Sequence, residues 1–323
     1  MSNLKAVQIG CGSRAQTHAR AIAQVEHLDF AATCDLIEEK ARKTADANSV
    51  HNIYTDFHQM MEEEQPDLVA FVAPPSIRSE VVLPVLEYKP KALVIEKPMA
   101  LSLEEAEQMV AAADEAGTCF VVCHQCRYSQ EMIRLRDLIQ SGRLGKVEKI
   151  IVNCKLDLMD QGTHILDLVE MMLPGQEPLW VMAQTDGTYP FCDHAILQVG
   201  YSDGVAVFAS IGRRSPDVPE NIDTISLQFQ VSAIGSHGYG EATLAYGLDA
   251  FFAGDKTEAH RFPGFDVNAH MTQSLYEEVV DVLEGKRDRH QASAHGALHV
   301  HRIIDATHES ALQGCAIILP YEP

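Results

Sequence analysis

The chain has 323 residues, which suggests two domains at ~150 residues per domain, and its 46% hydrophobic and 22% charged residues exclude global disorder. Its formal net charge is −21, from 25 Lys and Arg against 46 Asp and Glu. Because such a surface repels phosphate backbones and anionic lipids, we expect no nucleic-acid partner, no membrane partner and a small neutral substrate.

Short apolar runs in the first half of the chain alternate with helical patterns. Near-continuous apolar strands are typical of a parallel sheet that is covered on both faces. Ser76 and Ser102 are predicted to cap two of the helices, and Ser102 with Glu105 fits a capping box. We therefore predict a doubly wound parallel α/β domain, a Rossmann domain, over residues 1–124. The predicted strands are 4–9, 28–34, 68–72, 92–95 and 119–122, and the predicted helices are about 13–25, 36–47, 76–88 and 102–115.

The second half, residues 125–323, predicts an α/β domain with a large, mostly antiparallel sheet. Strands are expected at 147–156, 195–200, 205–211 and 225–231, with a helix at 161–173. Two late helices, about 268–284 and 293–313, are expected to cover one face of this sheet. Gln228 and Gln230 alternate with apolar residues and therefore belong to the opposite, polar face. Because that wide face lacks a cover, we expect it to mediate a homo-oligomer.

A phosphate-binding turn follows the first predicted strand. The segment Gly10-Cys11-Gly12-Ser13-Arg14-Ala15 has the form G-x-G-x-x-A between a strand and a helix. Gly10 permits the tight turn, Gly12 lets the backbone approach a pyrophosphate, and Ala15 allows close helix–strand packing. The alternative is a tight turn without a ligand.

Asp35 ends the second predicted strand, 23 residues after Gly12. A carboxylate there accepts hydrogen bonds from ribose hydroxyls and repels a 2′-phosphate, so NAD is favoured over NADP. Arg14 is the nearby cation that could still accommodate a phosphate.

Two further positions carry candidate proton-transfer and polarising groups. Lys97, in Glu96-Lys97-Pro98, follows the fourth predicted strand, at the sheet edge where open α/β sheets bind ligands. Its ammonium can polarise a substrate oxygen, although a surface Lys-Pro turn is an equally good interpretation. Asp160 and His164 stand four residues apart at a helix start and can point from one face. On spacing alone, Asp160 is as readily a helix cap and His164 a packed residue.

These residues resemble the Gfo/Idh/MocA family of oxidoreductases (glucose–fructose oxidoreductase, inositol dehydrogenase, MocA). The matching segments run in order over nearly the whole chain. They are residues 10–15 with His18, Cys34-Asp35-Leu36, Glu96-Lys97-Pro98, Gln125-Cys126-Arg127-Tyr128, 141–147, 160–164, 309–311 and 318–320.

The resemblance implies hydride transfer between NAD(P) and a sugar or cyclitol hydroxyl, and a homodimer or homotetramer. By matching position it gives catalytic roles to Lys97, Asp160 and His164. Arg127 and Arg78 are lesser candidates for substrate contacts. The expected cofactor-binding residues are Gly10, Gly12, Ser13, Arg14, Ala15, Asp35, Pro74, Glu96 and Lys97.

Two departures from the family pattern concern the substrate. Family members usually carry a longer, Gly-rich loop before the Asp–His helix, whereas here Cys154-Lys155-Leu156 leads almost at once to Asp160. Substrate contacts of that loop are therefore missing or supplied elsewhere. Arg78 stands where a His is common, in the loop after Pro74-Pro75.

The sequence thus predicts an NAD-dependent oxidoreductase acting on a secondary hydroxyl or ketone of a sugar, sugar derivative or cyclitol. The alternative is a catalytically silent dinucleotide-binding sensor of the same fold. We expect no metal site, since Cys123-His124-Gln125-Cys126 lacks a second pair at zinc spacing. The first residues lead straight into a strand and the eight Cys are scattered, so we expect reduced thiols and a cytoplasmic location.

Overall fold

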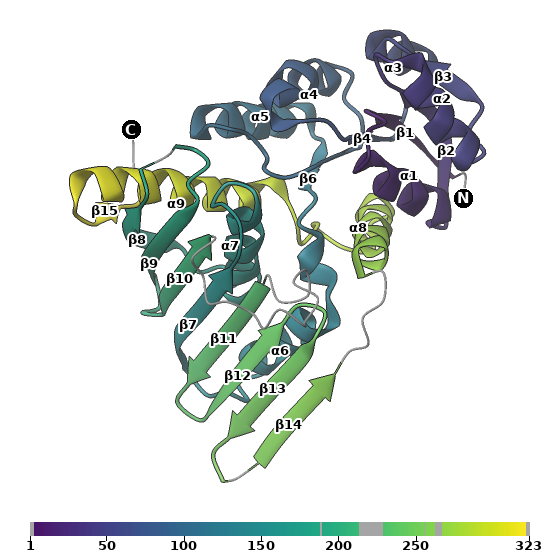
Figure 1. The fold of residues 1–323 in the computed structure, drawn as a ribbon. Helices are drawn as coiled ribbons and strands as arrows, with labels where there is room; N and C mark the ends of the chain where they lie inside the picture. Colours follow the sequence, from purple (N-terminus) through teal and green to yellow (C-terminus); the bar gives the residue numbers. More distant parts are fainter. Residues whose placement is uncertain (1–2, 188, 213–228, 255, 262–266, 321–323) are drawn as a thin grey trace. The chain divides into compact units, whose positions relative to one another are not determined.

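The structure is a computed structural model that describes residues 3–187, 189–212, 229–254, 256–261 and 267–320 (Figure 1). The chain divides into two compact units. Unit 1 comprises Met1–Gln125 and Asn268–Leu298, and unit 2 comprises Cys126–Val267 and His299–Pro323. None of the described helices is long and apolar enough to cross a membrane.

Unit 1 contains a six-stranded parallel sheet in the order β3-β2-β1-β4-β5-β6. This is the strand order of a dinucleotide-binding Rossmann fold, with the order reversing between β1 and β4. The predicted doubly wound parallel domain is therefore confirmed. The strands are β1 (Leu4–Ile9), β2 (Leu28–Cys34), β3 (Asn52–Tyr54), β4 (Leu68–Phe71), β5 (Ala92–Ile95) and β6 (Cys119–Val122).

Helices of unit 1 bury their apolar sides against this sheet. The core joins buried residues of β1, β4 and β5 to Met60, Val85 and Met109 from three of the helices. Ser102 caps α5 as predicted, because its side chain accepts from the backbone N–H of Glu105 at 3.2 Å. The helices are α1 (Ala15–Gln24), α2 (Glu38–Ala47), α3 (Phe57–Glu64), α4 (Arg78–Glu87), α5 (Leu103–Ala116) and α8 (Val267–Leu283), with a 3₁₀ turn η1 (Pro75–Ile77) before α4.

Two expectations for helices are wrong. Ser76 does not cap a helix, because it lies inside η1 and Ile77 is the residue that precedes α4. Helix α8 does not cover the second sheet, because it belongs to unit 1, where Tyr276 is fully buried and hydrogen-bonds His18 of α1. Apolar periodicity marks a helix as amphipathic but does not say which surface it packs against.

Unit 2 contains a nine-stranded sheet in the order β14-β13-β12-β11-β7-β10-β9-β8-β15. Among its described pairs only β7–β10 is parallel, so the predicted mostly antiparallel sheet is confirmed. The strands are β7 (Val147–Cys154), β8 (Pro178–Thr185), β9 (His194–Tyr201), β10 (Ala206–Gly212), β11 (Phe229–Gly235), β12 (Gly238–Thr243), β13 (Gly247–Phe252), β14 (Lys256–Arg261) and β15 (Ile317–Ile318).

One face of this sheet packs against helices, and the other exposes a row of mixed side chains. Helices α6 (Gln130–Gln140) and α7 (Gln161–Met172) pack on the central strands, and α9 (Ala294–Gln313) reaches β8 through Ser310. A 3₁₀ turn, η2 (Gln125–Tyr128), precedes α6. Met182, Gln198 and Phe208 are register neighbours on the opposite face, where Met182 is 53% exposed. That face is therefore partly apolar, and not purely polar as expected; Gln228 lies outside the described residues.

Candidate active site

The turn after β1 has the geometry that a dinucleotide requires. Gly10 has φ +89°, and a Cβ there would lie 2.2 Å from the carbonyl oxygen of Val72, so no other residue fits without a backbone shift. A Cβ at Gly12 would meet no atom within 4 Å, so the space above this backbone is open. Since α1 begins at Ala15, its first N–H groups also face this space. The turn therefore fits the pyrophosphate of a dinucleotide.

Asp35 is fixed at the carboxyl end of β2 by backbone donors. Its Oδ2 accepts from the N–H of Cys11 at 2.8 Å, and its Oδ1 accepts from the N–H of Ile37 at 2.9 Å. Each carboxylate oxygen has a second lone pair, so both can still accept from ribose hydroxyls. The carboxylate is thus held beside the phosphate-binding turn in an orientation that suits a ribose.

Arg14, the nearby cation that could still accommodate a 2′-phosphate, is paired with Glu96. Its Nε donates to Oε1 of Glu96 at 2.5 Å. In the better amide orientation of Gln125, the side-chain oxygen of that residue also accepts from Arg14 at 3.2 Å. The guanidinium therefore neutralises a carboxylate that follows β5, and reorienting it toward a phosphate requires breaking this ion pair.

Glu96 is the centre of a buried hydrogen-bond network. Nε2 of His18 contacts Glu96 Oε1 at 2.8 Å, and Nδ1 of the same ring contacts the Tyr276 hydroxyl at 2.7 Å. Burial alone would raise the pKa of Glu96, but His18 and the charge of Arg14 together lower this pKa well below its usual range. The carboxylate therefore stays charged near neutral pH. The stability it contributes is present above the usual Glu pKa and is lost as the pH falls through the lowered one.

Cys123 completes a cluster with His18 and Glu96, in which one potential ligand atom of each lies within 4.8 Å of the others. All three residues are buried, as a metal site would require. However, the Arg14 guanidinium already forms an ion pair with Glu96, and its positive charge would repel a metal cation. The cluster is therefore better described as a charge network than as a metal centre.

Lys97 follows Glu96 at the carboxyl edge of the parallel sheet. Its backbone N–H donates to Oε2 of Glu96 at 3.1 Å, and its bond to Pro98 is cis. Arg78 is 1% exposed, and its guanidinium donates to the carbonyl oxygens of Pro98 and of Ala73, the latter at 2.7 Å. Pro74, an expected cofactor contact, directly follows Ala73 and precedes η1.

In unit 2, α7 carries the predicted Asp–His pair. Asp160 is the residue before the helix, yet its side chain accepts no capping bond from the first turn. Asp157 fixes this turn instead, because its Oδ1 accepts from the N–H of Asp160 at 2.7 Å. His164 is buried, and its ring packs edge-on against Phe229 with 5.6 Å between centroids. The interpretation of Asp160 as a side-chain cap therefore does not describe its role.

Arg127 forms a buried ion pair with Asp167 of the same helix. Its Nε donates to Oδ2 at 2.7 Å, and one terminal nitrogen donates to Oδ1 at 2.8 Å. Burial lowers the pKa of Arg127, but the Asp167 carboxylate outweighs burial and leaves this pKa raised. The pair fastens η2 to α7, one turn after His164.

Sequence reasoning missed the partners of the predicted residues. Tyr276 lies 258 residues from His18, and no local motif signals their contact. Asp167 lies three residues after His164, a helical spacing that places it near the same side of α7 and could have drawn attention to it.

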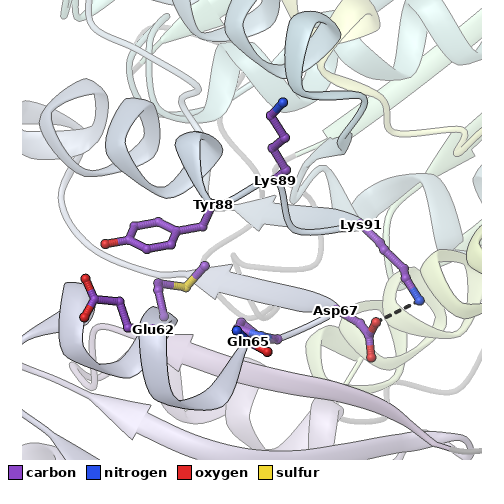
Figure 2. Close-up of a pocket in the computed structure, with 8 residues that line it drawn as sticks. Glu62, Gln65, Asp67, Tyr88, Lys89 and Lys91 are labelled. Carbon is purple, nitrogen blue, oxygen red and sulfur yellow. Dashed lines mark ion pairs between the residues drawn. The ribbon is translucent and has the colours of Figure 1, made fainter.

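A pocket of unit 1 is lined by none of these residues. It has a volume of about 420 Å³ and is lined by residues just before β4 and β5 and at the ends of α3 and α4. Figure 2 shows Asp67 paired there with Lys91, whose Nζ lies 2.9 Å from the carboxylate. These positions are at the amino ends of the strands, whereas open α/β sheets bind ligands at the carboxyl ends.

Comparison with known proteins relates the first domain to a family. Residues 4–124 match the family model of the Gfo/Idh/MocA oxidoreductases, described as an oxidoreductase family with an NAD-binding Rossmann fold. The matched segment is the Rossmann domain, which therefore resembles this family in sequence.

Two relatives named as sugar dehydrogenases match parts of the chain. It is 30% identical to a D-apiose dehydrogenase of Paraburkholderia graminis, over 45% of this chain and 38% of the relative. It is 27% identical to an NADP-dependent D-xylose 1-dehydrogenase of Haloarcula marismortui, over 66% and 60%. The chain thus spans less than two thirds of the length of these relatives.

Two solved structures share the fold over nearly the whole chain. An oxidoreductase from Agrobacterium radiobacter, in complex with NAD⁺, L-tartaric acid and magnesium, superposes with a TM-score of 0.87 at 18% identity, covering 98% of each chain. A super-repressor mutant of Gal80p from Saccharomyces cerevisiae gives 0.85 at 17% identity, again covering 98% of each.

Proposed function

We propose that the protein is an NAD-dependent oxidoreductase that transfers a hydride between the nicotinamide and a secondary hydroxyl or ketone of a sugar, sugar derivative or cyclitol. The observation that carries this proposal is the open backbone at Gly12 beside the fixed carboxylate of Asp35. The named activities of the apiose and xylose dehydrogenases support the substrate class.

NAD, when bound, supplies the hydride acceptor or donor. Gly10, Gly12, Ser13 and Ala15 belong to the turn that would hold its pyrophosphate, and Asp35 would hold its ribose. The ammonium of Lys97 binds and orients the substrate oxygen and stabilises negative charge that develops on it. An imidazole nitrogen of His164 takes the hydroxyl proton during oxidation, and Asp160 orients His164 or the substrate.

The direct test of this activity is absorbance of reduced nicotinamide after mixing the protein with NAD⁺ and a panel of sugars and cyclitols. We expect turnover with at least one member of the panel. No turnover with any member, despite measurable NAD⁺ binding, would contradict an oxidoreductase function.

We expect the protein to bind NAD⁺ more tightly than NADP⁺. A 2′-phosphate would meet the negative charge of Asp35, while Arg14 is engaged by Glu96. The change Asp35→Ser should narrow the difference in affinity, because serine holds the ribose of NAD⁺ less strongly and does not repel the 2′-phosphate of NADP⁺. Calorimetric titration with both cofactors measures this, and Asp29→Ser, at an exposed position of the strand that precedes Asp35, is the control. Equal affinities for wild type would show that Arg14 leaves its ion pair.

The second candidate is a dinucleotide-binding sensor without turnover. The shared fold of the Gal80p super-repressor favours it, since that structure's name describes a repressor. A sensor has no chemical need for Lys97, Asp160 and His164 together, which is why the enzyme is preferred. NAD⁺ binding combined with no turnover on the panel would favour the sensor.

We also propose a homodimer or homotetramer formed through the open sheet face of unit 2. This face exposes Met182, Ile196 and Phe208 on adjacent strands, and contiguous apolar surface of this kind marks interaction sites. Phe208→Glu should lower the mass measured by light scattering at micromolar concentration. The control is Leu312→Glu on α9, since Leu312 is also exposed. A monomeric mass for wild type contradicts this proposal.

The proposed location is the cytoplasm. The eight cysteines are scattered along the chain and most are buried, which suits reduced thiols in a reducing compartment.

A further inference from the structure

We propose that Glu96 and Arg78 act as positioning residues that hold the backbone of Lys97 and Pro98 from two sides. Together we call these two side chains the Lys97 clamp. The inference deepens the proposed function, on which it rests, because it concerns how the residue that polarises the substrate is fixed. Neither member of the clamp needs to touch substrate.

The first side of the clamp is the carboxylate of Glu96. Its Oε2 accepts from the backbone N–H of Lys97, the residue that follows it. Its Oε1 is held by Arg14 at 2.5 Å and by His18 at 2.8 Å. A carboxylate can accept all three bonds, because each of its oxygens has two lone pairs. The orientation of the Lys97 peptide is therefore set by contacts that reach α1.

His18 connects the Glu96 carboxylate to helix α8. Because a carboxylate only accepts, Nε2 of His18 carries a proton, and Nδ1 of the same ring meets the Tyr276 hydroxyl at 2.7 Å. His18 and Tyr276 are both fully buried, and their rings meet edge-on at 5.8 Å. The carboxylate is therefore held by partners that are themselves buried and packed against each other.

The second side of the clamp is the guanidinium of Arg78. It donates to the carbonyl oxygen of Pro98 and to that of Ala73. It is among the largest fully buried side chains in the described part of the chain. Burial lowers the pKa of Arg78 to about 10, and the charge of Glu96 acts in the opposite direction. A buried charge is costly, so its place between two loops indicates a requirement beyond packing.

This placement also bears on the expectation that Arg78 contacts substrate. A guanidinium that is 1% exposed and donates to two backbone carbonyl groups presents no charge at the surface. Arg78 instead connects the loop after β4, which leads to Pro74, with the segment after β5. Glu96 connects that same segment with the phosphate-binding turn through Arg14. The clamp therefore ties Lys97 to both loops expected to hold the cofactor.

The clamp predicts how fast the Lys97 amide exchanges its hydrogen with solvent, and this readout does not depend on activity. Gln has one acceptor oxygen and adds an N–H₂ group, so Glu96→Gln cannot accept from Arg14, His18 and Lys97 together. Mass spectrometry of a peptide spanning residues 93–101 in the ligand-free protein reports this amide, and Pro98 contributes none. We expect at least about tenfold faster exchange in Glu96→Gln and a smaller acceleration in Tyr276→Phe, which removes a single hydroxyl.

Arg78→Met tests the other side. Met keeps an unbranched stem but donates no hydrogen bond, so the Pro98 carbonyl loses its partner. We expect faster exchange in the same peptide, and a fall of about tenfold or more in kcat at saturating NAD⁺ and substrate for both Arg78→Met and Glu96→Gln. Saturation separates loss of positioning from loss of cofactor affinity.

Unit 1 offers a matched control at the other edge of its sheet. Glu64 is also buried and accepts from Tyr54 at 2.8 Å and from Asn52 at 2.7 Å. Glu64→Gln and Tyr54→Phe should change stability but neither the 93–101 peptide nor kcat. Unchanged exchange in both Glu96→Gln and Arg78→Met would overturn the clamp, as would faster exchange with unchanged kcat. If wild type turns over no substrate, the proposed function fails, while the exchange data still decide whether the clamp holds Lys97.

Discussion

His164→Ala is expected to lower turnover by about 10²–10⁴-fold while NAD⁺ affinity stays close to that of wild type. If His164 is the base, its neutral form takes the hydroxyl proton, and alanine leaves no group to do so. For wild type, the oxidation rate should rise with pH as the imidazole loses its proton. Steady-state kinetics over a range of pH, on the substrate found with the panel, measure both effects.

The competing explanation for His164 is packing, because the ring is buried and lies edge-on to Phe229. His308 is a matched control in the same unit, since it is also buried and lies edge-on to Tyr189 at 4.7 Å. His308→Ala should lower the melting temperature but leave turnover per folded molecule unchanged. A second variant, His164→Gln, keeps much of the side-chain volume and should still lose turnover. If activity of the His164 variants falls only with their folded fraction, His164 is a packing residue.

The first domain could be predicted closely because its signals are local. Strands such as Leu4–Ile9 and Ala92–Ile95 are continuous apolar runs, and their bounds agree with the structure. Strand β3 (Asn52–Tyr54) was missed because three residues at a sheet edge carry too little apolar pattern. Helix α3 follows it, and its apolar residues are interrupted by Gln59 and by the acidic run that starts at Glu62.

Strand ends and helix partners depend on information that sequence patterns lack. The strand expected to reach Leu156 ends at Cys154, because Leu156 adopts φ +68°, a conformation that no Leu preference signals. Likewise, the pattern of α8 indicates a buried face without indicating that it meets His18. Such contacts arise from packing between distant segments, which single-sequence periodicity does not encode.

The residues of the candidate site were predicted from motifs, but their partners were not. A motif identifies Glu96 and Lys97 because they follow a strand in sequence, and the neighbours of Glu96 then come from α1 and α8. Arg78 illustrates the opposite case. Its position after Pro74-Pro75 suggested a substrate contact, whereas the side chain turns inward to backbone carbonyl groups. The burial of the Arg78 side chain distinguishes a contact with backbone carbonyl groups from a contact with substrate, and the sequence does not show that burial.

Asp167→Asn is expected to destabilise unit 2 by about 3–5 kcal/mol, because it leaves the guanidinium of Arg127 buried without a full counter-charge. In the wild type, Arg127 is 6% exposed and its two hydrogen bonds to the carboxylate are 2.7 and 2.8 Å long. A loss of this size is a large part of the free energy of unfolding of a typical domain, which is about 5–15 kcal/mol. Urea unfolding of the variant and of wild type measures it.

A double replacement separates the cost of an unpaired charge from the value of the pair itself. Arg127→Met with Asp167→Leu removes both charges and keeps apolar volume, so it should recover most of the stability lost in Asp167→Asn. If the double variant is as unstable as the single one, the ion pair itself stabilises the fold. Because Asp167 lies one turn after His164 on α7, the double variant should regain stability but not full turnover. Recovery of both would show that the pair holds η2 against α7 without setting the position of His164.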